Sequence, residues 1–124
     1  MKRGPKKRYL LPQDEEEGIF HKWNINLKKF WLDHQQVLDE IEIGNLTYDS
    51  CDKFYNSWIC IIGIYSYCSV QWALPHTWPK PAHQKMKQEI LEQMEHIRKS
   101  VYPVKNDIDK VIQDTRLRSK QNVY

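Results

Sequence analysis

Apolar residues repeat with helical periodicity in two parts of the chain. Between residues 15 and 41 they recur along one helix face together with one histidine: Phe20, Trp23, Leu27, Phe30, Trp31, His34, Val37, Leu38 and Ile41. Between residues 81 and 100 the spacings are three and four, continuing to residue 101: Met86, Ile90, Met94, Ile97 and Val101. Such stripes are typical of amphipathic helices that bury one face. The pattern therefore predicts two amphipathic helices with a different kind of segment between them.

That segment, residues 54–74, has no polar face. Charged side chains are absent between residues 54 and 79, and serines are the main small polar interruptions: Ser57, Ser66 and Ser69. A helix that is apolar all round is normally buried, so we expect a central helix over residues 50–74. Two alternatives stay open. One is a membrane span over residues 58–74, at the short limit for a bilayer and flanked by tryptophans, and the other is a buried strand.

Turn-forming residues set the expected boundaries. Gly44 and Asn45 end the first helix, and three prolines between residues 75 and 82 end the second. Tyr102 and Pro103 are expected to break the chain again, before a short fourth helix that begins near residue 106. The predicted fold is all-α, a compact bundle of about four helices around a central buried hydrophobic helix. It divides into a basic N-terminal arm (1–13), a helical core domain (14–100) and a C-terminal tail with a short helix (101–124).

Charge is spread unevenly along the chain, although the net formal charge is only +3. The first eight residues contain five cations, Lys2, Arg3, Lys6, Lys7 and Arg8, and an acidic run follows at residues 14–17. Three lysines of the first helix, Lys22, Lys28 and Lys29, are expected to extend this basic surface along one side. Each basic residue near an anionic lipid surface contributes roughly 1 kcal/mol to binding. The sequence therefore predicts a phosphate-binding arm, whether the phosphate belongs to lipid or to nucleic acid.

Residues for catalysis or cofactor binding do not form a recognisable pattern. The three cysteines, Cys51, Cys60 and Cys68, lack metal-ligand spacing and are expected to be small buried hydrophobes. The five histidines lack the pairing of a zinc motif, and the four glycines are too scattered for a phosphate-binding loop. We therefore expect no catalytic residue, no metal site, no cofactor and no small-molecule substrate, and we do not expect the chain to be an enzyme.

Four short stretches resemble the matrix domains of lentiviral Gag polyproteins. Residues 3–10, RGPKKRYL, are similar to the basic stretch before a matrix core helix, and Phe54-Tyr55-Asn56 with the apolar run behind it is similar to the central buried helix. Residues 98–103, RKSVYP, resemble the segment after the last long matrix helix in the non-myristoylated bovine lineage. The final residues, QNVY, resemble those before the proline at a matrix–capsid protease site.

The resemblance implies a viral structural protein that targets Gag to acidic membranes and supports virion assembly. On this reading the arm contacts acidic phospholipid and also RNA, the chain self-associates, and it is found in the host cytoplasm, at the inner face of the plasma membrane and in the virion. Tyr102 and Pro103 would form a budding motif, and Tyr124 would be a protease cleavage end. A matrix domain without a lipid anchor needs a second membrane signal besides charge.

Two other functions remain alternatives. The chain could be a small helical nucleic-acid-binding or viral accessory protein whose arm wraps RNA, although it has no basic recognition helix for reading a DNA sequence. It could also be a single-pass membrane subunit with its span at residues 58–74.

Overall fold

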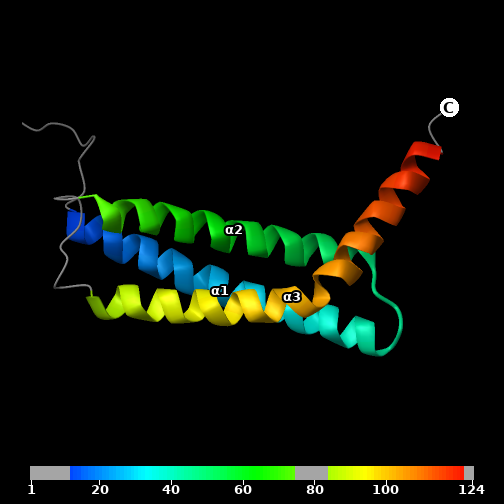
Figure 1. Ribbon diagram of the computed structural model, residues 1–124, viewed down its shortest axis with the longest axis horizontal. Helices are drawn as coiled ribbons and strands as arrows, with labels where there is room; N and C mark the ends of the chain where they lie inside the picture. Colours follow the sequence, from blue (N-terminus) through cyan, green and yellow to red (C-terminus); the bar gives the residue numbers. More distant parts are fainter. Residues whose placement is uncertain (1–11, 75–83, 122–124) are drawn as a thin grey trace, which may run out of the picture.

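The computed structural model describes residues 12–74 and 84–121, and these residues are all-helical. Three helices make up this part of the chain: α1 (Pro12–Glu42), α2 (Tyr48–Ala73) and α3 (Gln84–Gln121). They lie side by side, each running opposite to the one before it (Figure 1). The predicted all-α class is confirmed, and the alternative of a buried strand is wrong because residues 48–73 are helical.

The turn between α1 and α2 is short and densely hydrogen-bonded. Gly44 has a φ of +74°, a left-handed conformation that glycine adopts without strain, and its N–H donates to the carbonyl of Ile41. The next N–H, of Asn45, donates back to the carbonyl of Glu40 at 2.8 Å. Thr47 then caps α2, accepting a hydrogen bond from the N–H of Ser50. The predicted stop at Gly44 and Asn45 is therefore confirmed, and it returns the chain as an antiparallel hairpin.

The core is built from regularly spaced residues on one stripe of each helix. The buried hydrophobic side chains are Trp23, Phe30 and Val37 on α1, Cys51, Phe54, Ile61 and Cys68 on α2, and Ile90, Met94, Ile97, Val101, Val104 and Ile108 on α3. Most spacings are three, four or seven, the repeat with which helices pack closely at small crossing angles. Each fully buried large side chain contributes about 1.5 to 3 kcal/mol of hydrophobic stabilisation. This core holds the three helices together.

The expectation that the second helix is enclosed on every side is wrong. One side of α2 is buried, but the opposite side exposes Ile59 (54%), Val70 (55%) and Leu74 (44%), with Gly63 and Ser66 between them. We call these five residues the outer face of α2. Two neighbouring helices cover only part of a helix surface, so α2 packs against both α1 and α3 while the described residues leave its outer face uncovered.

The expected break at Tyr102 and Pro103 is also wrong, because α3 continues through both residues to Gln121. The core stripe of α3 continues across the proline without a change of spacing, since Val101 and Val104 are both buried. Proline lacks the N–H that would bond to residue 99, and it bends a helix at that point. Figure 1 accordingly shows the second half of α3 turning away from the first half and crossing the beginning of α2.

The helices cross the domain boundaries expected from the sequence. α1 begins at Pro12, inside the predicted arm, and α3 passes residue 100 without interruption. A separate short fourth helix is not found among residues 84–121, because its residues belong to α3. In the part of the chain that the structure describes, no helix has the length and hydropathy needed to cross a membrane.

Candidate functional site

Most of the predicted phosphate-binding residues lie outside the described part of the chain. Lys2, Arg3, Lys6, Lys7 and Arg8 precede Pro12, where the description begins. Tyr124, the predicted cleavage end, follows Gln121 and lies outside it as well. The structure locates the point at which the arm joins the bundle, which is the first turn of α1.

The three predicted lysines of α1 are exposed but do not form one continuous surface. Lys22 and Lys29 are seven residues apart and share one side of α1, while Lys28 lies about 120° further round the helix. Lys29 is already engaged, since its Nζ lies 3.1 Å from Oδ2 of Asp33 and 3.3 Å from Oγ of Ser57 on α2. Of the three, Lys22 is the one that borders an apolar groove between α1 and α2.

The formal charges of α1 and α3 are opposite in sign, and only that of α3 matches the basic arm. α1 has three lysines against eight acidic residues, a net charge of −5. α3 has nine lysines and arginines against six acidic residues, a net charge of +3. A basic surface beyond the arm is therefore expected from α3 more than from α1.

The end of the bundle next to the arm is held by tyrosine and tryptophan contacts to glutamates. We call it the arm end; it comprises the beginning of α1, the end of α2 and the beginning of α3 (Figure 1). Tyr67 donates its hydroxyl proton to Glu15 at 2.5 Å, and this hydrogen bond raises the pKa of Tyr67. The Nε1–H of Trp72 donates to Glu16 at 2.8 Å. These contacts fix the end of α2 against the first turn of α1.

A groove between α1 and α2 opens beside the outer face of α2. Its volume is about 460 Å³, and it is lined by Ile19, Lys22, Asn26, Cys60, Gly63, Ile64 and Tyr67. Gly63 contributes to the depth of this groove because no side chain projects from it and no heavy atom lies within 4 Å of where one would begin. Together, the groove and the outer face form an exposed surface without acidic residues, with Lys22 at its edge.

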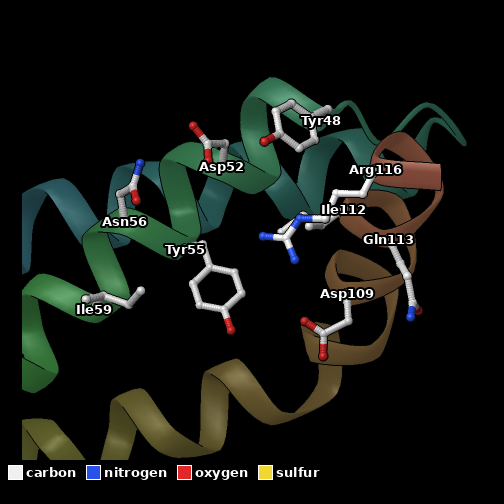
Figure 2. Close-up of a pocket in the computed structure, with 9 residues that line it drawn as sticks. All are labelled: Tyr48, Asp52, Tyr55, Asn56, Ile59, Asp109, Ile112, Gln113 and Arg116. Carbon is white, nitrogen blue, oxygen red and sulfur yellow. The ribbon is translucent and has the colours of Figure 1, made fainter. Parts of the chain in front are cut away.

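A second hollow, which we call the α2–α3 cleft, lies at the opposite end of the bundle. Its volume is about 580 Å³, within the range of ligand sites. It is lined by Tyr48, Asp52, Tyr55, Asn56 and Ile59 on α2 and by Asp109, Ile112, Gln113 and Arg116 on α3. Figure 2 shows the side chain of Arg116 extending from α3 toward α2, on the side where Tyr48 and Tyr55 lie. The bend at Pro103 creates this cleft by directing the second half of α3 across α2.

The cleft includes none of the candidate site residues expected from the sequence, although Tyr55 and Asn56 belong to the stretch that resembles the central matrix helix. Its α3 residues follow a helical spacing, at positions 109, 112, 113 and 116, and all four also fall within the short fourth helix expected from residue 106. The predicted break at Pro103 hid the position of that helix, because a helix separate from α3 need not cross α2. The unbroken three–four repeat of buried residues from Ile90 to Ile108 is the sequence feature that indicates the continuous helix.

Tyr102 and Pro103 lie on the exposed side of α3 at its bend. The side chain of Tyr102 is 83% exposed, the highest value among the large hydrophobic residues of the described chain. Both residues are part of a helix and not of an extended segment. Their role as a budding motif stays a prediction, and they are accessible to a partner.

The three cysteines have two different environments. Cys51 and Cys68 are buried, as expected, and burial raises the pKa of each thiol to about 11, with Glu40 and Glu16 respectively adding to the shift. Neither is therefore a reactive thiolate near neutral pH. Cys60 is exposed in the groove, so the prediction of burial is wrong for this residue. Among the described residues, no group of three or more histidine, cysteine or acidic side chains could hold a metal ion.

His34 is half-buried and lies beside the core, on the stripe of the first helix where the sequence places it. Its Nε2 lies 3.3 Å from the carbonyl oxygen of Ser100, and its ring lies beside Phe30 and Phe54. Burial lowers the pKa of His34, the hydrogen bond to Ser100 raises it, and the nearby His96 lowers it, with burial the largest of the three effects. The neutral ring therefore links all three helices.

Comparison with known proteins does not add a relative to this description. No protein-family model matches the chain, and no curated protein or solved structure is significantly similar to it. The resemblance to lentiviral matrix domains therefore rests on the four short stretches alone.

Proposed function

We propose that this chain is a non-enzymatic structural protein of the Gag matrix type, which binds the acidic inner face of the host plasma membrane and supports virion assembly. The arm residues Lys2, Arg3, Lys6, Lys7 and Arg8 contact phospholipid phosphates, and RNA competes for the same cations. The observation that carries the proposal is the composition of the arm end. The basic arm joins the bundle at the same end at which α2 exposes Val70 and Leu74.

This arrangement supplies the two membrane signals that stable peripheral binding needs. The arm provides electrostatic attraction, which acts over about 8 Å at physiological salt. The exposed apolar residues at the end of α2 provide a contact that salt does not screen. Lys22, which borders the α1–α2 groove, adds positive charge beside this surface, and the exposed Lys85 lies at the beginning of α3, at the same end of the bundle.

The proposal predicts salt-sensitive binding to acidic vesicles. The full chain is mixed with vesicles of phosphatidylcholine containing 30% phosphatidylserine, and bound protein is measured by co-sedimentation between 50 and 500 mM salt. Replacing Lys6, Lys7 and Arg8 with alanine removes about 3 kcal/mol of attraction, at roughly 1 kcal/mol per cation, and is expected to weaken binding about a hundredfold. The double variant Val70→Asn with Leu74→Asn removes the apolar contact instead of the charge. We expect it to weaken binding at high salt more than binding at low salt.

The matched control removes the same charge elsewhere. Arg98, Lys99 and Lys110 are exposed on α3, away from the arm end, and their replacement with alanine should leave most of the binding intact. Equal binding to vesicles of phosphatidylcholine alone, or binding that salt does not change, would contradict the proposal. Displacement of the chain from acidic vesicles by substoichiometric single-stranded RNA would favour the nucleic-acid-binding alternative instead.

A further inference from the structure

The second half of α3 has one face turned into the α2–α3 cleft. This face consists of Asp109, Ile112, Gln113 and Arg116, which lie within two turns of one another at spacings of three and four. A negative side chain stands at one end of the face and a positive one at the other, with an apolar and a neutral polar side chain between them. When two copies of this face lie antiparallel, the negative end of each copy therefore meets the positive end of the other.

An antiparallel pair of these segments would satisfy both charges at once. If a two-fold axis passes between Ile112 and Gln113, Asp109 of one copy lies opposite Arg116 of the other, and the reverse pair forms by symmetry. Asp107 and Arg118 are each two residues away, about 200° further round the helix, so they lie on its other side and take no part in this contact. Two-fold symmetry requires this kind of self-complementarity, and the four residues of the face provide it without a like-charge contact among themselves.

We propose that the α2–α3 cleft is the interface of a symmetric homodimer, in which the second half of α3 from one copy lies antiparallel to the same segment of the other. The partner's helix covers the cleft and packs against the exposed Tyr48 and Ile59 of α2, while Ile112 lies at the two-fold axis. The interface goes beyond the membrane contact proposed above, because it lies at the opposite end of the bundle and forms without lipid.

Arg116 and Asp109 can each form the ion pair with the partner copy without losing a contact within their own chain. Arg116 has no ion pair with another described residue, and its guanidinium presents several donors. Asp109 accepts from Lys105 at 2.8 Å, in a surface pair of adjacent helix turns that contributes little to stability. A carboxylate accepts more than two hydrogen bonds, so Asp109 can bind the partner's Arg116 while keeping Lys105.

The length of the segment limits the strength of the dimer. Residues 104–121 form a helix of about 27 Å, at 1.5 Å per residue. Two such segments, each also touching α2 of the other copy, are expected to bury about 1,200 Å² in total. This area is the lower end of the range for stable interfaces. We therefore expect a reversible dimer that dissociates in the micromolar range.

Reversing the charge of Asp109 or Arg116 tests the proposed pairing directly. Sedimentation velocity of the full chain between 1 and 500 μM, without lipid, is expected to show a monomer–dimer equilibrium. Asp109→Arg and Arg116→Asp should each weaken association at least tenfold, because each places two like-charge pairs in the interface. An equimolar mixture of the two single variants should form a heterodimer, and the double variant carrying both changes should regain self-association, because both restore opposite charges across the axis.

Arg98→Asp is the matched control. Arg98 lies on the first half of α3, where it forms a weak 3.7 Å pair with Glu95, and its reversal is expected to leave association unchanged. Circular dichroism of each variant checks that the helices are retained. A chain that stays monomeric at 500 μM, single variants that dimerise as well as the parent, or a mixture that stays monomeric would each overturn the proposal and leave the cleft to a different occupant. None of these outcomes bears on vesicle binding, so the two proposals fail separately.

Discussion

At the scale of single residues, Glu40 is the most strongly perturbed acid described. Its carboxylate accepts hydrogen bonds from the N–H and hydroxyl of Thr47, both at 2.9 Å, from the hydroxyl of Ser50 and from the amide of Gln36. The bond from Ser50 is the largest cause that lowers the pKa of Glu40 to about 2. This one side chain therefore ties the last turn of α1 to the cap of α2.

We predict that Glu40→Gln destabilises the protein by about 1 to 2 kcal/mol at pH 7, since a neutral amide replaces a charged acceptor of several hydrogen bonds and solvent screens part of the effect. The folded-state pKa lies below the unfolded one, so the stabilisation by Glu40 is complete above about pH 4.5 and is lost as pH falls toward 2. The free energy of unfolding is measured by urea unfolding, followed by circular dichroism, at pH 7, 4.5 and 3. The difference between the variant and the parent protein should become smaller as the pH falls.

The exposed Glu42, two residues later on the same helix, provides the control for this measurement. Glu42→Gln should change the free energy of unfolding by less than about 0.5 kcal/mol. A Glu40→Gln variant as stable as this control would refute the role of Glu40 in joining the two helices.

At the scale of elements, α1 and α2 are paired by polar contacts as well as by the core. Ser57, which is buried on α2, donates its hydroxyl proton to Asp33 on α1, and Lys29 reaches both of them. A buried hydroxyl needs such a partner, because its transfer from water is otherwise unfavourable. The contact fixes the register of the two helices at their middle, between the turn at Gly44 and the glutamate contacts at the arm end.

Ser57→Ala tests this register contact. Removal of the hydroxyl takes a hydrogen bond from the poorly exposed Asp33 carboxylate, so the free energy of unfolding should fall by about 1 to 2 kcal/mol. Ser66→Ala changes an exposed serine on the outer face of the same helix and is expected to have almost no effect. The comparison is made by urea unfolding at pH 7, and equal stability of the two variants would show that the Ser57–Asp33 bond is dispensable.

At the scale of the whole molecule, the two ends of the bundle have different surfaces. The arm end joins a basic segment to an exposed apolar face, whereas the opposite end holds the α2–α3 cleft. A dimer through the cleft would keep both arm ends away from the interface, so each stays accessible to a membrane. His34 lies where all three helices meet, which makes its protonation a property of the whole bundle.

We predict that stability falls with pH below about 6.5 because of His34. Burial holds its pKa below the unfolded value, so the unfolded chain binds a proton that the folded chain resists, and acid favours unfolding in this range. His34→Gln keeps a donor for the carbonyl of Ser100 but cannot titrate, so its free energy of unfolding should vary less between pH 7 and 5.5. His21→Gln, at an exposed position of α1, is the control and should retain the slope of the parent protein.

The pattern of apolar residues was sufficient to predict three amphipathic or apolar helical regions and the turn at Gly44. These features are local: a stripe spaced at three and four residues favours a helix, and a left-handed position favours glycine. The position of the half-buried His34 beside the core also followed from its place on the stripe of α1. The boundaries came within a few residues for α1 and α2, because capping and turn residues act over only a few positions.

What the sequence by itself determined is therefore the helical class, the helix faces available for burial and the charge of the arm. Only the tertiary structure decided which apolar faces are covered, since Ile59 and Val70 look as apolar as Ile61 along the chain but lie on the side of α2 that neither α1 nor α3 covers. It also decided that Pro103 bends α3 without ending it, because burial of Val101, Val104 and Ile108 against the bundle outweighs the local cost of about 3 kcal/mol for a proline within a helix. That bend forms the cleft, which depends on contacts between residues more than fifty positions apart and which periodicity alone does not encode.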